Sequence, residues 1–183
     1  MQDASAFTAV LFGLRGCLVQ TANGTPLPAP GALDSLARLR SRRVPCIWLD
    51  ELSNNQGKRW TGVLPEWLPG HPVNGSSWPA PNACWQALMS LHSQRLDGCV
   101  LVSGEPRLLQ SGLNAGLWTV GLAACEQDSA QWQALSRQEQ ERARGKATLA
   151  LYGLGVHSVI DHLEALDACL ADIAQRRHKG EKP

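Results

Sequence analysis

Residues 112–121 read GLNAGLWTVG, and this stretch decides the fold. Its first half ends a segment, 105–115, whose leucines recur on one side as in an amphipathic helix. Its second half contains the apolar run 118–122, and another apolar run, GCVLV at 98–102, precedes the helix. Short apolar runs separated by a helix predict parallel strands of one sheet.

The same alternation extends over the rest of the chain. Further buried strands are predicted at 6–12, 44–49 and 156–160, and helices at 32–43, 81–92, 131–153 and 162–177. Residues 50–58 fit a short helix, 21–31 a loop, and 62–81 irregular structure rich in Pro and Gly. We therefore predict an α/β fold: a Rossmann-like parallel sheet of about five strands with helices on both faces. Ligands in such sheets bind beyond the carboxyl ends of the strands, so the loops after Phe12, Leu49 and Val102 are expected to line any pocket.

Bulk properties favour one domain over residues 1–183, with a frayed tail at 178–183. The formal net charge of +1 gives no electrostatic case for nucleic acid or an anionic membrane. No run approaches the roughly 20 apolar residues of a membrane span, and the start, MQDASAF, does not resemble a signal peptide. Widely spaced cysteines without a C-x-x-C motif favour reduced thiols and a cytoplasmic location: Cys17, Cys46, Cys84, Cys99, Cys125 and Cys169.

Three stretches together carry a family resemblance: GLNAGLWTVG at 112–121, GLGVHSVID at 153–161, and WPAP at 78–81. The chain resembles the phosphonoacetaldehyde hydrolase family of the haloacid dehalogenase superfamily, from about Val44 onward and over the first strand. The resemblance implies a haloacid dehalogenase-like core and hydrolase chemistry. In that chemistry a carboxylate at the end of the first strand attacks phosphorus and forms an aspartyl-phosphate.

Aligned on Gly16, the nucleophile position of the family falls on Gly13, which has no side chain. Arg15 stands two residues later, where many relatives have an acid, and the Thr pair of the family is replaced by Cys17 and Leu18. The phosphate-binding hydroxyl of the second motif falls on Asp50, or one residue earlier on Leu49.

The remaining motif positions are also altered. The cation that would pair with phosphate ahead of P-x-P is replaced by Trp78. The magnesium-binding Asp of the family falls on Gly104, with Glu105 one residue out of register, so we expect no metal or other cofactor unless Glu105 substitutes as a Mg²⁺ ligand. About thirty residues separate Gly16 from the second strand, which leaves no room for the family's cap and supplies no Schiff-base lysine.

These positions predict a capless, catalytically inactive relative with a binding or regulatory role. One alternative is a hydrolase of altered chemistry that uses Arg15, Asp50 and Glu105 in the same cleft. The simpler interpretation of these residues is an Arg15–Asp50 ion pair that fills the vacated pocket, with Glu105 at the start of the next helix, where an acid favours the positive end of the helix dipole.

Seven tryptophans accompany only one Tyr and two Phe. Trp60, Trp67 and Trp78 either cover a sheet edge or form a contact surface for a protein partner or a second copy of the chain. This second alternative would make the protein a scaffold or dimer subunit. His157 is interpreted as a packing residue, and the spacing of His71, His92, His162 and His178 does not predict a zinc site.

Overall fold

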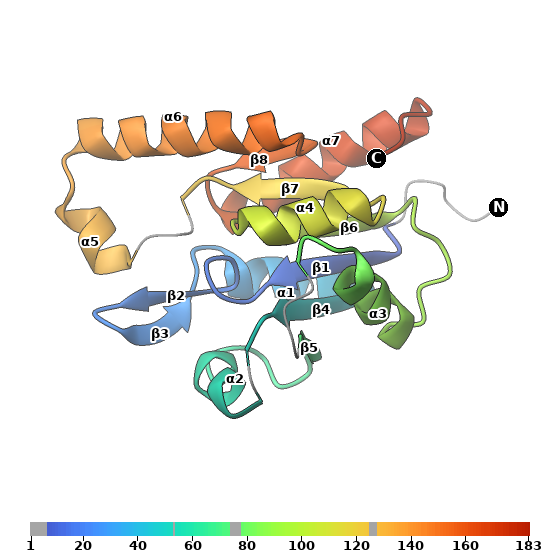
Figure 1. The fold of residues 1–183 in the computed structure, drawn as a ribbon, viewed down its shortest axis with the longest axis horizontal. Coiled ribbons are helices and arrows are strands. Elements are labelled where there is room, and N and C mark those ends of the chain that lie inside the picture. Colours follow the sequence, from blue (N-terminus) through green and yellow to red (C-terminus); the bar gives the residue numbers. More distant parts are fainter. Residues whose placement is uncertain (1–6, 53, 74–77, 125–127) are drawn as a thin grey trace.

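The computed structural model describes residues 7–52, 54–73, 78–124 and 128–183. Its main sheet has six parallel strands in the order β5-β4-β1-β6-β7-β8 (Figure 1). The strands are β1 Ala9–Gly13, β4 Cys46–Asp50, β5 Gly70–Pro72, β6 Cys99–Ser103, β7 Trp118–Leu122 and β8 Ser158–Ile160. The α/β fold is thus confirmed, and the strand count is corrected from about five to six. The additional strand is β5, a three-residue edge strand inside the stretch that was expected to be irregular.

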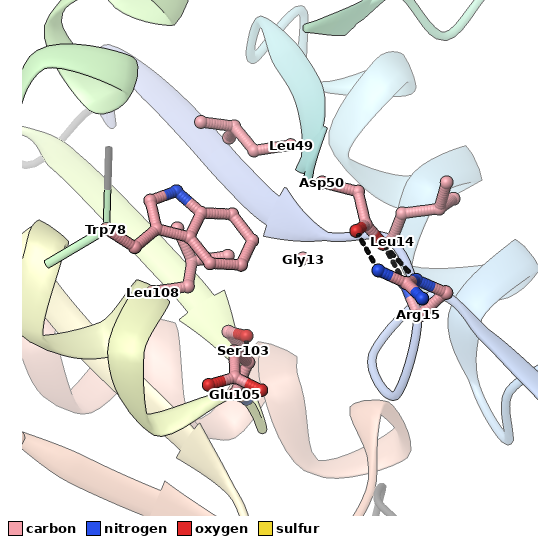
Figure 2. A pocket seen from close by; sticks show the side chains of 9 residues that line it. All are labelled: Gly13, Leu14, Arg15, Leu49, Asp50, Trp78, Ser103, Glu105 and Leu108. Atoms are coloured by element: carbon pink, nitrogen blue, oxygen red, sulfur yellow. Dashed lines mark hydrogen bonds and ion pairs between the residues drawn. The ribbon is translucent and has the colours of Figure 1, made fainter. Parts of the chain in front are cut away.

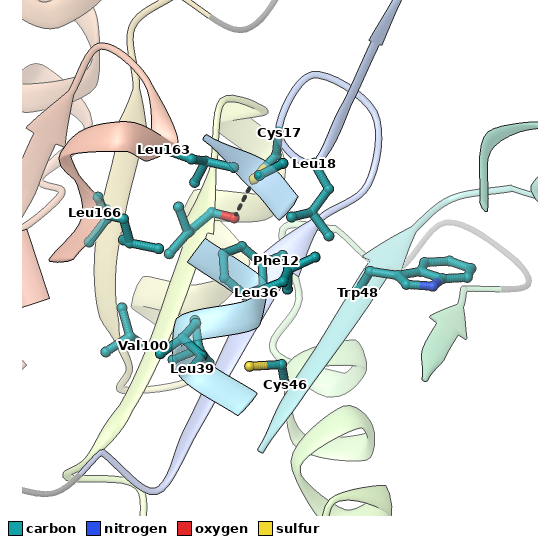
Figure 3. Packing of buried hydrophobic residues seen from close by; sticks show 14 of the residues in the cluster. Phe12, Cys17, Leu18, Leu36, Leu39, Cys46, Trp48, Val100, Leu163 and Leu166 are labelled. Atoms are coloured by element: carbon teal, nitrogen blue, oxygen red, sulfur yellow. Dashed lines mark hydrogen bonds between the residues drawn. The ribbon is translucent and has the colours of Figure 1, made fainter. Parts of the chain in front are cut away.

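The four central strands β1, β4, β6 and β7 are buried throughout, because helices cover both faces of the sheet, whereas the edge strands β5 and β8 are partly exposed. Along β1, Val10 and Phe12 point into one core and Ala9 and Leu11 into the other, as the two-residue period of a strand requires. The first core packs against α1 Ala32–Ser41 and α7 Leu166–His178 (Figure 3). The second packs against α3 Asn82–Ser90 and α4 Pro106–Asn114. The remaining helices are α2 Asn54–Thr61, α5 Ser129–Ala134, α6 Arg137–Leu154 and the 3₁₀ turn Leu163–Ala165.

Two expectations about the chain's connections need correction. Residues 21–31 are not simply a loop, because β2 Val19–Ala22 and β3 Thr25–Pro28 form an antiparallel hairpin. Its turn places Asn23 and Gly24 at positive φ, 51° and 76°, the geometry that an Asn-Gly hairpin turn requires. The helix expected at 131–153 is two helices, because Ser136 begins α6 with a capping box to Glu139.

No cap domain stands between the first two strands of the sheet core. Residues 14–45 are all described, and their only regular elements are the hairpin and α1. The hairpin lies beyond the carboxyl end of β1 (Figure 1). Thr21 donates a hydrogen bond to Asp128 at the start of α5, and Arg59 of α2 donates one to the Gly24 carbonyl, so the hairpin is held on two sides.

The stretch 112–121 forms the join between α4 and β7. A Cβ added at Gly112 would lie 2.5 Å from Leu101 Cδ2, and one at Gly121 would lie 3.0 Å from Leu151 Cδ1. Trp118 between them is fully buried. These glycines therefore allow close approach between helices and sheet, which explains why this stretch identifies the fold.

Five of the six cysteines fall in the described residues, and all five are buried thiols. Burial raises the pKa of Cys46 to about 12 and that of Cys84 to about 11, so both resist ionisation and behave as small core side chains. Cys125 lies outside the described residues. Among the described helices, none combines the length and apolarity needed to cross a bilayer.

Candidate functional site

A small cleft opens where β1, β4 and β6 end, at the carboxyl edge of the sheet (Figure 2). It measures about 60 Å³. Small-molecule sites typically measure about 300–1,000 Å³, so this cleft is several times smaller. The lining is Gly13, Leu14, Arg15, Leu49, Asp50, Trp78, Ser103, Glu105 and Leu108, and it does not include Gly104.

Arg15 and Asp50 form an ion pair at this edge, as the simpler interpretation expected. Arg15 Nη2 donates to Asp50 Oδ1 over 2.7 Å, and Arg15 Nε donates to Oδ2 over 2.9 Å. This two-pronged contact is the geometry that a guanidinium forms best with a carboxylate. The Asp50 side chain is 5% exposed and that of Arg15 is 44% exposed, so the carboxylate is buried while the guanidinium reaches solvent. The hydrogen bond to Asp50 raises the pKa of Arg15, and burial opposes that shift.

Backbone N–H groups of the loop after β1 also donate hydrogen bonds to the end of β4. The Arg15 N–H donates to Asp50 Oδ2 over 3.1 Å, and the Leu14 N–H donates to the Leu49 carbonyl over 3.1 Å. Backbone N–H groups in such loops are suited to hold the oxygens of an anion. Here the Asp50 carboxylate is the anion that the Arg15 amide holds, and a second anion at the same atoms would meet its negative charge.

Gly13 contributes no functional group, and Ser103 takes the space above it. A Cβ added at Gly13 would lie 2.7 Å from Ser103 Oγ and 3.3 Å from Ser103 Cβ. Ser103 is fully buried, and its hydroxyl oxygen accepts the Glu105 N–H over 3.0 Å. An acidic side chain at position 13 would therefore require Ser103 to move. Nothing in the local sequence pattern pointed to this filling role of Ser103.

The residues at this edge do not fit the magnesium ion that the family resemblance implies. Gly13 and Gly104 offer no side-chain oxygen, and both Asp50 oxygens are used by Arg15. Glu105 is the N-cap of α4, where its Oε1 accepts the Arg107 N–H over 3.0 Å. The described residues contain no cluster of three acidic, His or Cys side chains suited to a metal. The capping role expected for Glu105 is thus present in the structure.

Trp78 lines the cleft opposite Arg15, with its indole ring turned toward Gly13 (Figure 2). It is 8% exposed, and its indole N–H has no hydrogen-bond partner among the described residues. Arg107 of α4 holds this segment, because its Nη2 donates to the Trp78 carbonyl over 2.7 Å while its Nη1 pairs with Glu51 over 3.1 Å. Sequence reasoning missed this link, since nothing in the local pattern joins positions 78 and 107.

The other tryptophans singled out do not form an exposed patch. Trp60 and Trp67 are partly buried against the core on the α1 face of the sheet, and Arg40 stacks over Trp67 at 4.9 Å. Their packing supports the sheet-covering alternative. The tryptophan that is exposed is Trp85 of α3, at 44%.

His157 lies away from the cleft, between β7 and α7. Its Nδ1 accepts the Thr119 N–H over 3.0 Å, and its ring packs against Trp118 at a centroid distance of 4.8 Å. Burial, and secondly the charge of Arg176, lower its pKa, so the ring favours the neutral form. These contacts fit the packing role expected from the sequence.

Sequence comparison relates the chain to longer hydrolases. Phosphonoacetaldehyde hydrolase of Klebsiella pneumoniae is 31% identical over 85% of this chain, and that of Salmonella enteritidis is 30% identical over the same share. The chain spans 62% of the length of each of these curated relatives. No family model matches the chain.

Solved structures agree with this relationship. A phosphonoacetaldehyde hydrolase-like protein from Oleispira antarctica is 26% identical, with a TM-score of 0.74 over 85% of this chain and 60% of its own. A haloacid dehalogenase family hydrolase from Deinococcus radiodurans, solved with bound phosphate and sodium, shares the fold at 18% identity, with a TM-score of 0.70 over 93% of this chain and 97% of its own. Another solved chain is 50% identical, with a TM-score of 0.90 over 97% of this chain and 100% of its own.

The six-stranded parallel sheet, its helices and the cleft beyond its carboxyl edge define a haloacid dehalogenase-like core. By sequence the chain is related to phosphonoacetaldehyde hydrolase, and its core has the haloacid dehalogenase-like fold.

Proposed function

We propose that this chain is a catalytically inactive, single-domain relative of phosphonoacetaldehyde hydrolase that acts in binding or regulation in the cytoplasm. The observation that carries the proposal is the Asp50 carboxylate, which is bound by the guanidinium and the backbone amide of Arg15 inside the cleft. A phosphoryl group would have to displace this internal anion.

The chemistry supports the same conclusion. Phosphoryl transfer through an aspartyl-phosphate needs a carboxylate in line with phosphorus and a cation to balance the developing charge. Gly13 supplies no nucleophile at the expected position, and Arg15 is neutralised by Asp50. Catalytic residues act as a unit, so losing one key member removes most of the rate.

The rival hypothesis, a hydrolase of altered chemistry, would use Arg15, Asp50 and Glu105. The contacts of these residues favour it less. Arg15 and Asp50 neutralise each other, and Glu105 is engaged in capping α4. A general base must reach a proton of the substrate, and the cleft of about 60 Å³ leaves little room for one.

Phosphate release from phosphonoacetaldehyde and from simple phosphomonoesters, with Mg²⁺ present, tests the proposal. The expected result is the same background rate for the natural protein and for Asp50→Asn and Glu105→Gln. Turnover by the natural protein that either substitution abolishes would establish the rival hypothesis instead.

A further inference from the structure

A second hollow lies at the opposite edge of the sheet, where β1 and β4 begin. This groove measures about 370 Å³, six times the cleft volume and within the range of ligand sites. It runs between the end of α1 and the side of α7, and α7 ends on the side of the molecule away from the hairpin β2–β3 (Figure 1). Its lining is Phe7, Leu39, Arg42, Arg43, Val44, Asp167, Leu170 and Ala171.

The floor of the groove is apolar. Leu39 and Leu170 belong to the core, and Phe7 and Val44 pack against it while remaining partly exposed. Arg177 stacks over the outer face of Phe7 at 5.4 Å. An aliphatic chain laid along this floor would remove apolar surface from water, the main source of affinity for such ligands.

The rim carries more positive than negative charge. Asp167 is the lining carboxylate, and it already pairs with Arg38 and, over 3.4 Å, with Arg42. The Arg43 side chain is exposed, and it has no ion pair or hydrogen bond with another described residue. An anionic headgroup would meet an unneutralised guanidinium there.

The backbone at Arg43 turns the chain out of α1. Its φ is +58°, directly after the C-cap of the helix, a position that glycine or asparagine usually takes. This turn places Arg43 in the lining of the groove.

We propose that this groove binds a small aliphatic monoanion, a carboxylate whose alkyl chain lies over Phe7, Val44 and Leu170 and whose headgroup pairs with Arg43. The site is separate from the cleft at the carboxyl edge, so it stands whether or not the chain has catalytic activity. It gives the molecule a ligand site larger than the cleft of about 60 Å³ can offer.

Octanoate is the probe. It is titrated into the protein, and binding is followed by calorimetry and by the chemical-shift changes of the Val44 and Leu170 amide resonances in NMR spectra. Hexanoate is expected to bind more weakly by about fourfold for each methylene removed. Octylammonium, with the same chain and the opposite charge, is expected not to bind at the concentrations used.

Two variants test the geometry without disturbing the core. Arg43→Gly removes the guanidinium and suits the left-handed backbone, so the protein should fold at least as well and octanoate affinity should fall tenfold or more. Ala171→Trp places a bulky ring from an exposed position on α7 into the groove and should abolish binding. Arg137→Gln is the control, since it removes one positive charge from a side chain that is 91% exposed and outside the groove.

The proposal is overturned if octanoate fails to bind, if octylammonium binds equally well, or if Arg43→Gly and Ala171→Trp leave the affinity unchanged. Binding that is seen only after residues 1–6 are removed would also overturn it, since the groove would then serve the start of the chain itself.

Discussion

The join between α4 and β7 and the carboxyl edge of the sheet differ in what their residues do. At the join, residues 112–121 satisfy packing: Gly112 and Gly121 admit Leu101 and Leu151, and Trp118 is fully buried. At the edge, Gly13 carries no functional group, and Arg15 and Asp50 contact each other. We call the packed sheet and helices the frame, and the join belongs to it. Under the proposed function, the frame is the part that resembles the relatives, and the edge is the part in which the residues depart from them.

The comparison teaches that the fold does not depend on the chemistry at its edge. Side chains that bury apolar area determine the sheet order, and a changed edge leaves that order intact. Where a site no longer catalyses a reaction, its polar side chains can form ion pairs and hydrogen bonds with one another and fill the space. Under the proposed function, the Arg15–Asp50 pair is such a filling, so the edge should now behave as structure.

The largest expected effect comes from breaking that pair on one side. Arg15→Ala leaves the Asp50 carboxylate buried without its guanidinium and should lower the free energy of unfolding by about 2–3 kcal/mol. Asp50→Ala should cost only about 1 kcal/mol, because Arg15 is half exposed and can turn to water. Urea unfolding of both variants measures the asymmetry.

The double variant Arg15→Ala/Asp50→Ala sharpens the same test. It should be no less stable than Asp50→Ala within error, because no charge is then stranded. Equal losses in the two single variants would show that the pair does not act as a structural plug.

Crowding the contact between α4 and the sheet should lower the free energy of unfolding by somewhat less. Gly112→Ala pushes a Cβ against the fully buried Leu101, and we expect a loss of about 1–2 kcal/mol from overpacking, although alanine favours a helix. Gly145→Ala in α6 is the matched control, since a Cβ there meets nothing within 4 Å. It should stabilise the protein by about 0.5–1 kcal/mol. Thermal unfolding of both variants decides the point, and a stabilised Gly112→Ala would contradict the close-approach argument.

The smallest expected effect is the pH dependence of the free energy of unfolding that His157 contributes. The pKa of His157 is lowered in the folded state, first by burial and then by Arg176, so the unfolded chain binds the proton more readily. The stabilising contribution is present above the unfolded pKa of about 6.5 and is lost as pH falls below it. We expect the free energy of unfolding to decline between about pH 7 and 5.5, and His157→Asn to flatten this decline. An unchanged slope in that variant would assign the decline to other groups.

The sequence was sufficient to predict most of the frame. The strand at 118–122 was placed at its observed bounds, and α1, α3 and α4 agree within two residues at each end. The central strands were predictable because they are buried throughout, so each one is an uninterrupted apolar run. The hairpin was missed although Asn23-Gly24 is a strong turn signal, since its strands are four residues long and the second contains two prolines. Edge strand β5 has too few residues for any pattern.

The site was predictable in its membership and less so in its contacts. The strand ends had to bring Gly13, Asp50 and Glu105 together, because parallel strands end at one edge. The hydroxyl of Ser103 above Gly13 and the hold of Arg107 on Trp78 depend on side-chain rotamers and on contacts between distant segments. No local pattern carries that information.

One measurement addresses the central claim most directly: ³¹P NMR of phosphonoacetaldehyde incubated for hours with an equal amount of the protein and excess Mg²⁺. Stoichiometric protein makes even a very slow reaction visible, and Asp50→Asn purified in parallel controls for contaminating phosphatases. The account predicts that the phosphonate resonance persists in both samples and that inorganic phosphate does not accumulate. Conversion to phosphate by the natural protein, absent with Asp50→Asn, would contradict it.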